Sequence, residues 1–134
     1  MDNSIIIWKY LLPLLNENAE LAKYVNENYI YPLAALEGTP FPYIIYRRDS
    51  LVPTYTKHLQ GYCGWVNDIT ISLSVYSDNY DESAYIANLI RDILENYCFE
   101  NEEIKIHPIE LINSNEYYSE NGFEQRLTFS VTAE

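Results

Sequence analysis

Histidine and cysteine offer the most chemistry of any side chains in this sequence, and it has two of each. His58 and Cys63 are close together in the chain, so the centre that they could form is a thiolate nucleophile with an imidazole base. No third residue at a matching spacing would orient the imidazole. A metal site from His58 and His107 would require a loop and a distant strand to meet. We therefore predict neither catalytic residues nor a metal site.

Carboxylates are abundant, so neighbouring pairs alone indicate nothing. They gather at two places: a polar turn with Glu100, Glu102 and Glu103, and a predicted helix start with Asp78, Asp81 and Glu82. Neither group has the spacing of a calcium-binding loop, and we interpret them as a solvated acidic turn and as helix capping. The chain has no nucleophile elbow and no zinc-protease motif, and its four glycines give no phosphate-binding loop. No cofactor is predicted.

The charge balance is strongly acidic. Eight basic against twenty acidic residues give a net charge of −12. Binding to a nucleic-acid backbone requires Lys and Arg to replace condensed counterions, so we predict no direct, sequence-specific nucleic-acid binding. Two roles near nucleic acid remain open: mimicking it, or lining a passage that it slides through. The fourteen tyrosines suit half-exposed sheet faces and protein interfaces, although AT-rich codon usage would produce the same enrichment.

The sequence gives no indication of secretion or of a membrane partner. Its start lacks a basic region, Lys9 interrupts the first apolar run, and no apolar stretch approaches the roughly 20 residues of a membrane span. Cys63 and Cys98 are isolated and fit free thiols in a reducing compartment. We therefore expect a soluble protein that is intracellular when made.

The apolar periodicity predicts helices at the start and in the middle of the chain. A first helix should follow Asn3 or Ser4 and be kinked or ended near Leu12 by Pro13. Its apolar face is predicted to consist of Ile5, Trp8, Leu12 and Leu15. A short second turn is expected over Ala19–Val25. The main helix should cover Asp81–Tyr97 and bury one apolar stripe on the sheet, formed by Ile86, Leu89, Ile90, Ile93, Leu94 and Tyr97.

Period-two alternation and turn residues predict the strands. They are expected at Tyr43–Asp49, Trp65–Tyr76, Ile104–Ile112 and Phe123–Ala133, after a short extended piece at Tyr29–Tyr31. Pro108 indicates an edge or a bulge, and Asn113–Gly122 is expected to turn. Leu51–Gly64 is a long loop or hairpin arm that is too apolar for a purely solvated linker, so a partner-binding arm and plain disorder both remain open.

These elements predict one α+β domain over residues 1–134. The sheet should be mainly antiparallel with about four strands, and the N-terminal helical region and the long amphipathic helix should pack on one of its faces.

The order of these elements resembles the small tail-completion, or tail-terminator-like, proteins of long-tailed bacteriophages and prophages. The resemblance covers almost the whole chain and rests on the helical start, the turn Ile30-Tyr31-Pro32, the strand entry Phe41-Pro42-Tyr43-Ile44-Ile45-Tyr46, the loop Pro53-Thr54-Tyr55, the strand Ile69–Tyr76, the helix Asp81–Tyr97 and the closing strand Arg126–Thr132. The long helical lead with Pro13 and the very acidic turn at Glu100–Glu103 depart from the family's pattern.

The resemblance implies a structural role without enzymatic activity. Such proteins cap the head-proximal end of the tail tube as a ring, commonly of six subunits, and join the tail to the head. The implied partners are other copies of this chain, the tail tube protein and the head connector protein. The implied location is the bacterial cytoplasm during assembly and then the virion tail.

Two sets of residues are candidates for this role. A ring needs interfaces in which one patch binds a different patch on the next subunit. The predicted subunit interface consists of Tyr55, His58, Leu59 and Tyr62 on the arm, with Arg47 and Arg48 at its base. An acidic lumen would repel passing DNA, and the residues expected to face it are Asp68, Glu100, Glu102 and Glu103.

Two other classes of function remain as alternatives. An acidic DNA mimic or inhibitor would share the charge and the tyrosine-rich surface, but it would bind a basic partner with strong salt dependence. A small enzyme of unrecognised type has no constellation of residues behind it.

Overall fold

One curled sheet organises the chain. The computed structural model describes residues 3–57 and 63–134, which contribute seven strands to this sheet. The strands are β1 (Ile30–Pro32), β2 (Tyr43–Lys57), β3 (Cys63–Ser77), β4 (Phe99–Glu100), β5 (Lys105–Ile106), β6 (Glu110–Ser119) and β7 (Gly122–Ala133). Their order is β1-β2-β3-β7-β5-β4, and β6 also pairs with β7. Every pairing is antiparallel except that of β1 with β2. The mainly antiparallel sheet was predicted, but the estimate of about four strands was too low.

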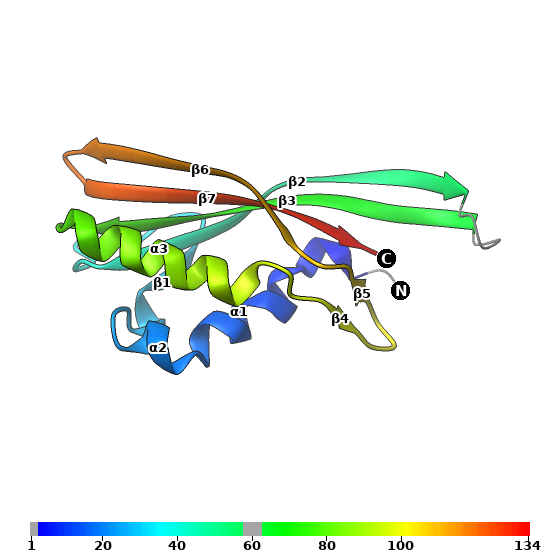
Figure 1. Cartoon of the computed structure of the whole chain (residues 1–134), viewed down its shortest axis with the longest axis horizontal. Coiled ribbons are helices and arrows are strands. Elements are labelled where there is room, and N and C mark those ends of the chain that lie inside the picture. Colours follow the sequence, from blue (N-terminus) through cyan, green and yellow to red (C-terminus); the bar gives the residue numbers. More distant parts are fainter. Residues whose placement is uncertain (1–2, 58–62) are drawn as a thin grey trace.

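Helices cover one face of this sheet (Figure 1). They are the 3-10 turns η1 (Ser4–Ile6) and η2 (Glu27–Tyr29) and the α-helices α1 (Trp8–Asn16), α2 (Ala19–Ala22) and α3 (Tyr80–Leu94). The longest, α3, begins at Asn79, whose side chain accepts the backbone N–H of Glu82 at 3.0 Å. The helix ends earlier than predicted because Glu95 is extended and Asn96 has a φ of 68°. Asn79 therefore provides the cap that was expected from Asp78 or Asp81.

The N-terminal helix differs from its prediction in extent and in register. Pro13 lies inside α1, and the helix continues to Asn16. Leu11 and Leu15 are fully buried, so packing outweighs the hydrogen bond that Pro13 cannot make. Because η1 precedes the helix, Ile7 faces the core and Ile5 is 70% exposed. Of the expected apolar face, Leu15 is buried and Trp8 and Leu12 pack partly buried against the core, but the prediction for Ile5 was wrong.

The long segment after Pro42 forms a projecting hairpin and not a loop. β2 and β3 pair from Tyr43↔Tyr76 to Lys57↔Cys63, with a bulge between Arg48 and Ser50. Of the two readings that the sequence left open for Leu51–Gly64, the described residues follow the hairpin arm. His58, Leu59 and Tyr62 lie outside the described residues.

The last part of the chain also holds more strand than predicted. β6 covers most of the segment expected to turn, because residues 113–119 pair along β7 in spite of their Asn and Ser content. The actual turn is tight and is followed by Gly122, with a φ of 88°. A Cβ on Gly122 would lie 2.6 Å from the carbonyl oxygen of Ser77, so this position requires glycine.

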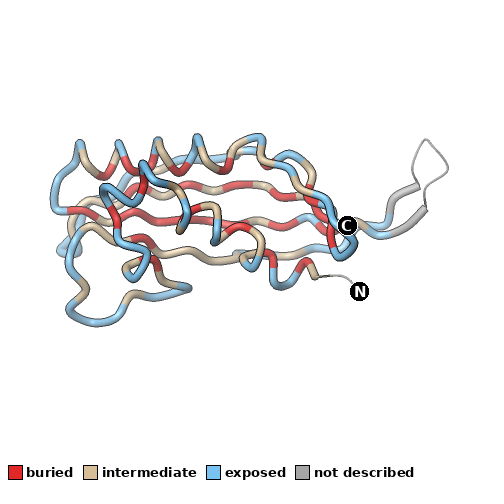
Figure 2. Tube along the Cα trace, turned by 90° about the horizontal axis from the view of Figure 1, so that it is seen from below, coloured by how far each residue is buried: buried red, intermediate tan, exposed pale blue. Residues whose placement is uncertain are grey.

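The core lies between the helices and the facing side of the sheet. Figure 2 shows buried residues alternating along the central strands and recurring on the inner side of the helices. The largest fully buried side chains are Phe129, Ile7, Leu11, Leu15, Leu21, Ile44, Ile69, Ile71, Leu73, Ile86, Ile90 and Leu94. They come from both ends of the chain, so this core holds the base of the hairpin in place.

Candidate functional site

The hairpin arm is the most distinctive surface of the molecule. We use this name for the described residues 51–57 of β2 and 63–68 of β3, which extend beyond the helices (Figure 1). Tyr55 lies opposite Trp65 in the register, and their rings meet edge to face with centroids 5.4 Å apart. These rings lie on the same side of the sheet as the helices, because Trp65 and buried Ile69 are four residues apart in one strand. Tyr55 is 47% exposed and Trp65 61% exposed.

The opposite face of the hairpin arm combines an aliphatic side chain with an acid. Val52 is 55% exposed and pairs with Asp68 in the register. The Thr54 hydroxyl donates to the Asp68 carboxylate at 3.0 Å. Both faces of the arm therefore present apolar area. Trp65 was not among the predicted interface residues, although its position opposite Tyr55 on an alternating strand was a usable signal.

The base of the hairpin arm is braced by the N-terminal turn. Arg47 and Arg48 lie on opposite faces, and both have partners within the chain. Arg47 Nε donates to Asp49 at 3.0 Å, and Arg48 Nη1 donates to the carbonyl of Ile5 at 2.9 Å. Arg48 therefore anchors the N-terminal turn to β2. Neither arginine projects from the arm with the aromatic pair.

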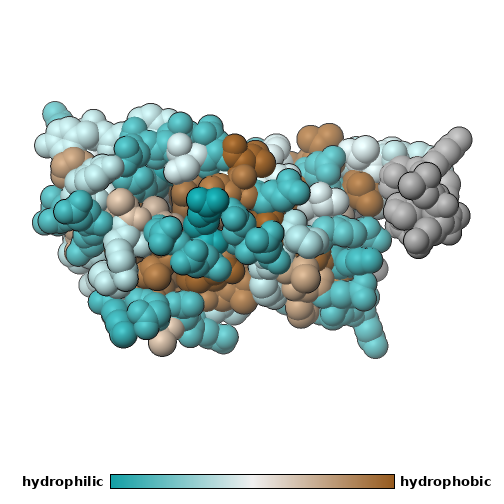
Figure 3. Space-filling view, in the orientation of Figure 1, coloured by the Kyte–Doolittle hydropathy of each residue, from teal (hydrophilic) through white to brown (hydrophobic). Residues whose placement is uncertain are grey.

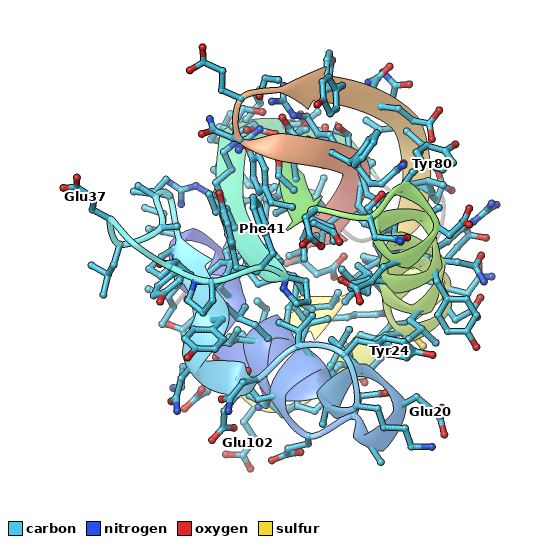
Figure 4. All side chains as sticks on the ribbon, turned by 90° about the vertical axis from the view of Figure 1, so that its left-hand side faces the viewer. Glu20, Tyr24, Glu37, Phe41, Tyr80 and Glu102 are labelled. Atoms are coloured by element: carbon cyan, nitrogen blue, oxygen red, sulfur yellow. The ribbon has the colours of Figure 1, made fainter. Side chains whose placement is uncertain are left out.

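The predicted lumen residues do not form one cluster. Asp68 lies on the helix-free face of β3, whereas Glu100, Glu102 and Glu103 belong to the β4–β5 hairpin. Glu100 pairs with Lys105 at 3.7 Å. Glu102 is exposed and points away from the body, as Glu37 does (Figure 4).

The side chain of Glu103 forms hydrogen bonds and an ion pair within the chain. Its carboxylate accepts the Tyr10 hydroxyl at 2.9 Å and the Asn3 amide at 3.3 Å, and Lys9 Nζ is 3.7 Å away. These contacts, chiefly the Tyr10 hydrogen bond and then the Lys9 charge, lower the pKa of Glu103. The β4–β5 hairpin is thus tied to α1. Glu103 is therefore less available for a lumen role than its two neighbours.

The histidine and cysteine side chains form no reactive pair in the part of the chain that the structure describes. His107 Nε2 lies 2.8 Å from a carboxylate oxygen of Glu134, as a surface pair. Cys98 is an exposed free thiol. Within residues 3–57 and 63–134, no group of three or more His, Cys, Asp or Glu residues is arranged to hold a metal ion.

A second exposed surface lies along β6, which the sequence analysis had treated mainly as a turn. Ile112, Tyr117 and Tyr118 are 54%, 47% and 75% exposed. Glu116 accepts the Tyr80 hydroxyl and the Gln125 amide, at 2.5 Å and 2.8 Å. These two hydrogen bonds lower the pKa of Glu116. The space-filling view shows that hydrophobic surface is divided into small areas by hydrophilic side chains (Figure 3).

The fold and these surfaces define a small α+β protein whose distinguishing feature is a projecting hairpin with exposed aromatic residues. The chain belongs to the family described as tail completion protein gp17, which it matches over residues 9–133. The protein is therefore a structural component of a phage tail and not an enzyme, in agreement with the predicted family and class.

Structural comparison supports the same fold. A chain of the virion of a native gene transfer agent (GTA) particle superposes with a TM-score of 0.64 at 18% identity. The alignment covers 90% of this chain and 89% of the other. No curated protein sequence matches the chain. Among the described residues, no helix is long and apolar enough to cross a membrane.

Proposed function

We propose that this chain caps the head-proximal end of the tail tube as a ring, commonly of six subunits, and joins the tail to the head connector. Its partners would be neighbouring copies, the tail tube protein and the connector protein, met in the bacterial cytoplasm and kept in the virion tail. The observation that carries the proposal is the hairpin arm, whose two faces expose Val52, Tyr55 and Trp65. An isolated two-stranded hairpin is only marginally stable in water, so contact with a partner surface would stabilise this arm.

The arm suits a ring because its contact would be heterologous. Tyr55 and Trp65 are residue types that dominate interface energy, and their exposed edge-to-face pair would dock as one unit. A heterologous contact of arm to neighbour generates a closed ring when the rotation between subunits closes. His58, Leu59 and Tyr62, which lie outside the described residues, are proposed to belong to the same contact. Arg47 and Arg48, which have partners within the chain, would stiffen its base.

The test of the ring is absolute mass by light scattering across protein concentration and salt, with negative-stain images of any large species. We expect a ring that persists at high salt, because its contacts would be apolar. Tyr55→Ser with Trp65→Ser should abolish it. The matched control is Tyr85→Ser, which removes a similarly exposed tyrosine, 52% exposed, from α3. A monomer at every concentration that binds basic proteins in a salt-sensitive way would instead favour an acidic mimic or inhibitor.

The acidic surface would serve the passage of DNA. A lumen lined either by the face of β3 with Asp68 or by the acidic hairpin with Glu100 and Glu102 would repel the phosphate backbone and avoid retaining it. Glu100→Lys with Glu102→Lys should impair DNA delivery and leave folding intact, because Glu103 and its contacts to α1 are kept. Glu27→Lys with Glu37→Lys makes the same change in net charge elsewhere. Equal infectivity of the two double variants would contradict the lumen assignment.

A further inference from the structure

The sheet has several edges, and most of them are protected against pairing with another strand. β1 is three residues long and ends at Pro32, and β4 has only two residues. β2 is covered by β1 at Ile44–Tyr46, interrupted by the bulge after Arg48, and lacks a backbone donor at Pro53. Short strands, bulges and prolines are the usual devices that prevent edge-to-edge association.

β6 lacks most of these devices. It has ten residues and no proline, and after a bulge between Leu111 and Asn113 its ladder to β7 is regular from Asn113 to Ser119. Among the described residues, none pairs with its other edge. Ile112, Tyr117 and Tyr118 favour strand pairing and are largely exposed. This strand therefore presents unpaired backbone groups and exposed side chains together.

The surroundings of β6 indicate what could pair with it. A hollow of about 160 Å³ lies between α3 and β6 and is lined in part by Asn88, Leu111 and Ser114. Side chains on one face of an added strand could enter it. β6 and its turn carry Glu110, Glu116 and Glu120 and no basic residue. Arg91, which lines the hollow, and Arg126 of β7 lie nearby, but each forms an ion pair with a glutamate close to it in sequence. An added strand would therefore gain from Lys or Arg at its exposed positions.

A second copy of this chain fits the edge poorly. Two β6 strands would bring together two surfaces that both carry glutamates and no lysine or arginine, and this like charge disfavours their association. The edge of β2 is blocked by its bulge and by Pro53, and β1 and β4 are too short to match ten residues. We propose that the outer edge of β6 binds an extended basic segment of a different protein by strand addition. This proposal goes beyond the ring and does not depend on it.

The test uses the full chain and a synthetic peptide of the length of β6, with lysines alternating with Val and Thr. Hydrogen–deuterium exchange should slow in residues 113–119 on binding and stay unchanged in residues 51–57 of β2. Two further peptides carry N-methyl groups on alternate backbone nitrogens. One of them has its methyl groups directed toward β6 and should not bind, although its charge is the same. Equal binding of all three peptides would show charge attraction without strand pairing and would overturn the proposal.

Variants then separate local charge from net charge. Glu110→Lys with Glu120→Lys should weaken peptide binding about tenfold, while Glu116 and its contacts to Tyr80 and Gln125 are kept. The control is the Glu27→Lys and Glu37→Lys double variant, which should bind like the unmodified chain. Equal weakening by both, or protection of β2 in place of β6, would overturn the proposal. Protection of residues 113–119 that grows with protein concentration and needs no peptide would assign the edge to a second copy instead.

Discussion

The strand β3 has a buried part in the body and an exposed part in the arm, and the α-helices pack only against the first. In the body, Ile69, Ile71 and Leu73 are buried with 0–1% exposure beneath the helices. In the arm, Trp65 lies on the same face of the same strand and is 61% exposed. Trp65 and buried Asn67 continue the face of Ile69 toward the arm, although Val66 also places apolar area on the opposite face. The residue pattern of a strand therefore predicts which face packs against other residues. It does not predict whether those residues belong to the same chain or to another protein.

The largest effect on stability should come from removing a side chain at the centre of the body. Phe129 of β7 is fully buried and lies opposite Ile71. Phe129→Ala should lower the free energy of unfolding by about 3–5 kcal/mol, from lost transfer free energy and the cavity left behind. Urea unfolding followed by circular dichroism measures the change. A loss below about 1 kcal/mol would mean that the body is no better packed than the arm.

The next largest effect should come from the turn that joins β6 to β7. Gly122→Ala would place a Cβ 2.6 Å from the Ser77 carbonyl oxygen while φ is 88°. We expect a loss of roughly 1–3 kcal/mol in the free energy of unfolding. Gly38→Ala is the matched control, because Gly38 has a φ of 82° but open space around its Cα. It should cost less, and an equal loss in both variants would show that backbone strain alone acts at Gly122.

Much of the body was predictable from sequence because its signals are local. The alternation of Ile69–Val75 and the helical spacing of Ile86, Ile90 and Leu94 identify the core faces directly. β1 overlaps the extended piece expected at Tyr29–Tyr31, and β5 lies within the strand expected at Ile104–Ile112. β4 has only two residues and forms through pairing with β5, so no local pattern predicted it. β6 was missed because residues typical of turns were held in a strand by β7.

The candidate surfaces were harder to predict, because they depend on contacts between residues far apart in the sequence. The arm could be located because Leu51–Gly64 contains Pro53, Gly61 and Gly64 but is too apolar for a purely solvated linker. The lumen residues could not be assigned, because Asp68 and the three glutamates of the β4–β5 hairpin are related only by the tertiary fold. The commitment of Glu103 to Tyr10 joins residues far apart in sequence, and neither carries a motif.

A smaller effect should appear when the pH is lowered. The folded-state pKa of Glu103 lies below its unfolded value, so its ionised form stabilises the fold. This contribution is complete above the ordinary glutamate pKa of about 4.3 and is lost as the pH falls through the lowered folded-state pKa. Glu103→Gln should therefore reduce stability at neutral pH and flatten its decline in acid. Glu102→Gln, which changes an exposed residue of the same hairpin, is the control in urea unfolding at several pH values.

The smallest effect on folding should come from the arm itself. Trp65→Ser removes a ring that is mostly exposed and whose contact with Tyr55 is worth about 0.5–1.5 kcal/mol at most. The free energy of unfolding of the monomer should thus change by no more than about 1.5 kcal/mol, far less than for Phe129→Ala. The same substitution should have its main effect on assembly. If Trp65→Ser destabilised the monomer as much as Phe129→Ala, the arm would already be covered within its own chain. The two parts of β3 would then not differ in packing, and the proposal that Tyr55 and Trp65 bind a neighbouring subunit would lose its support.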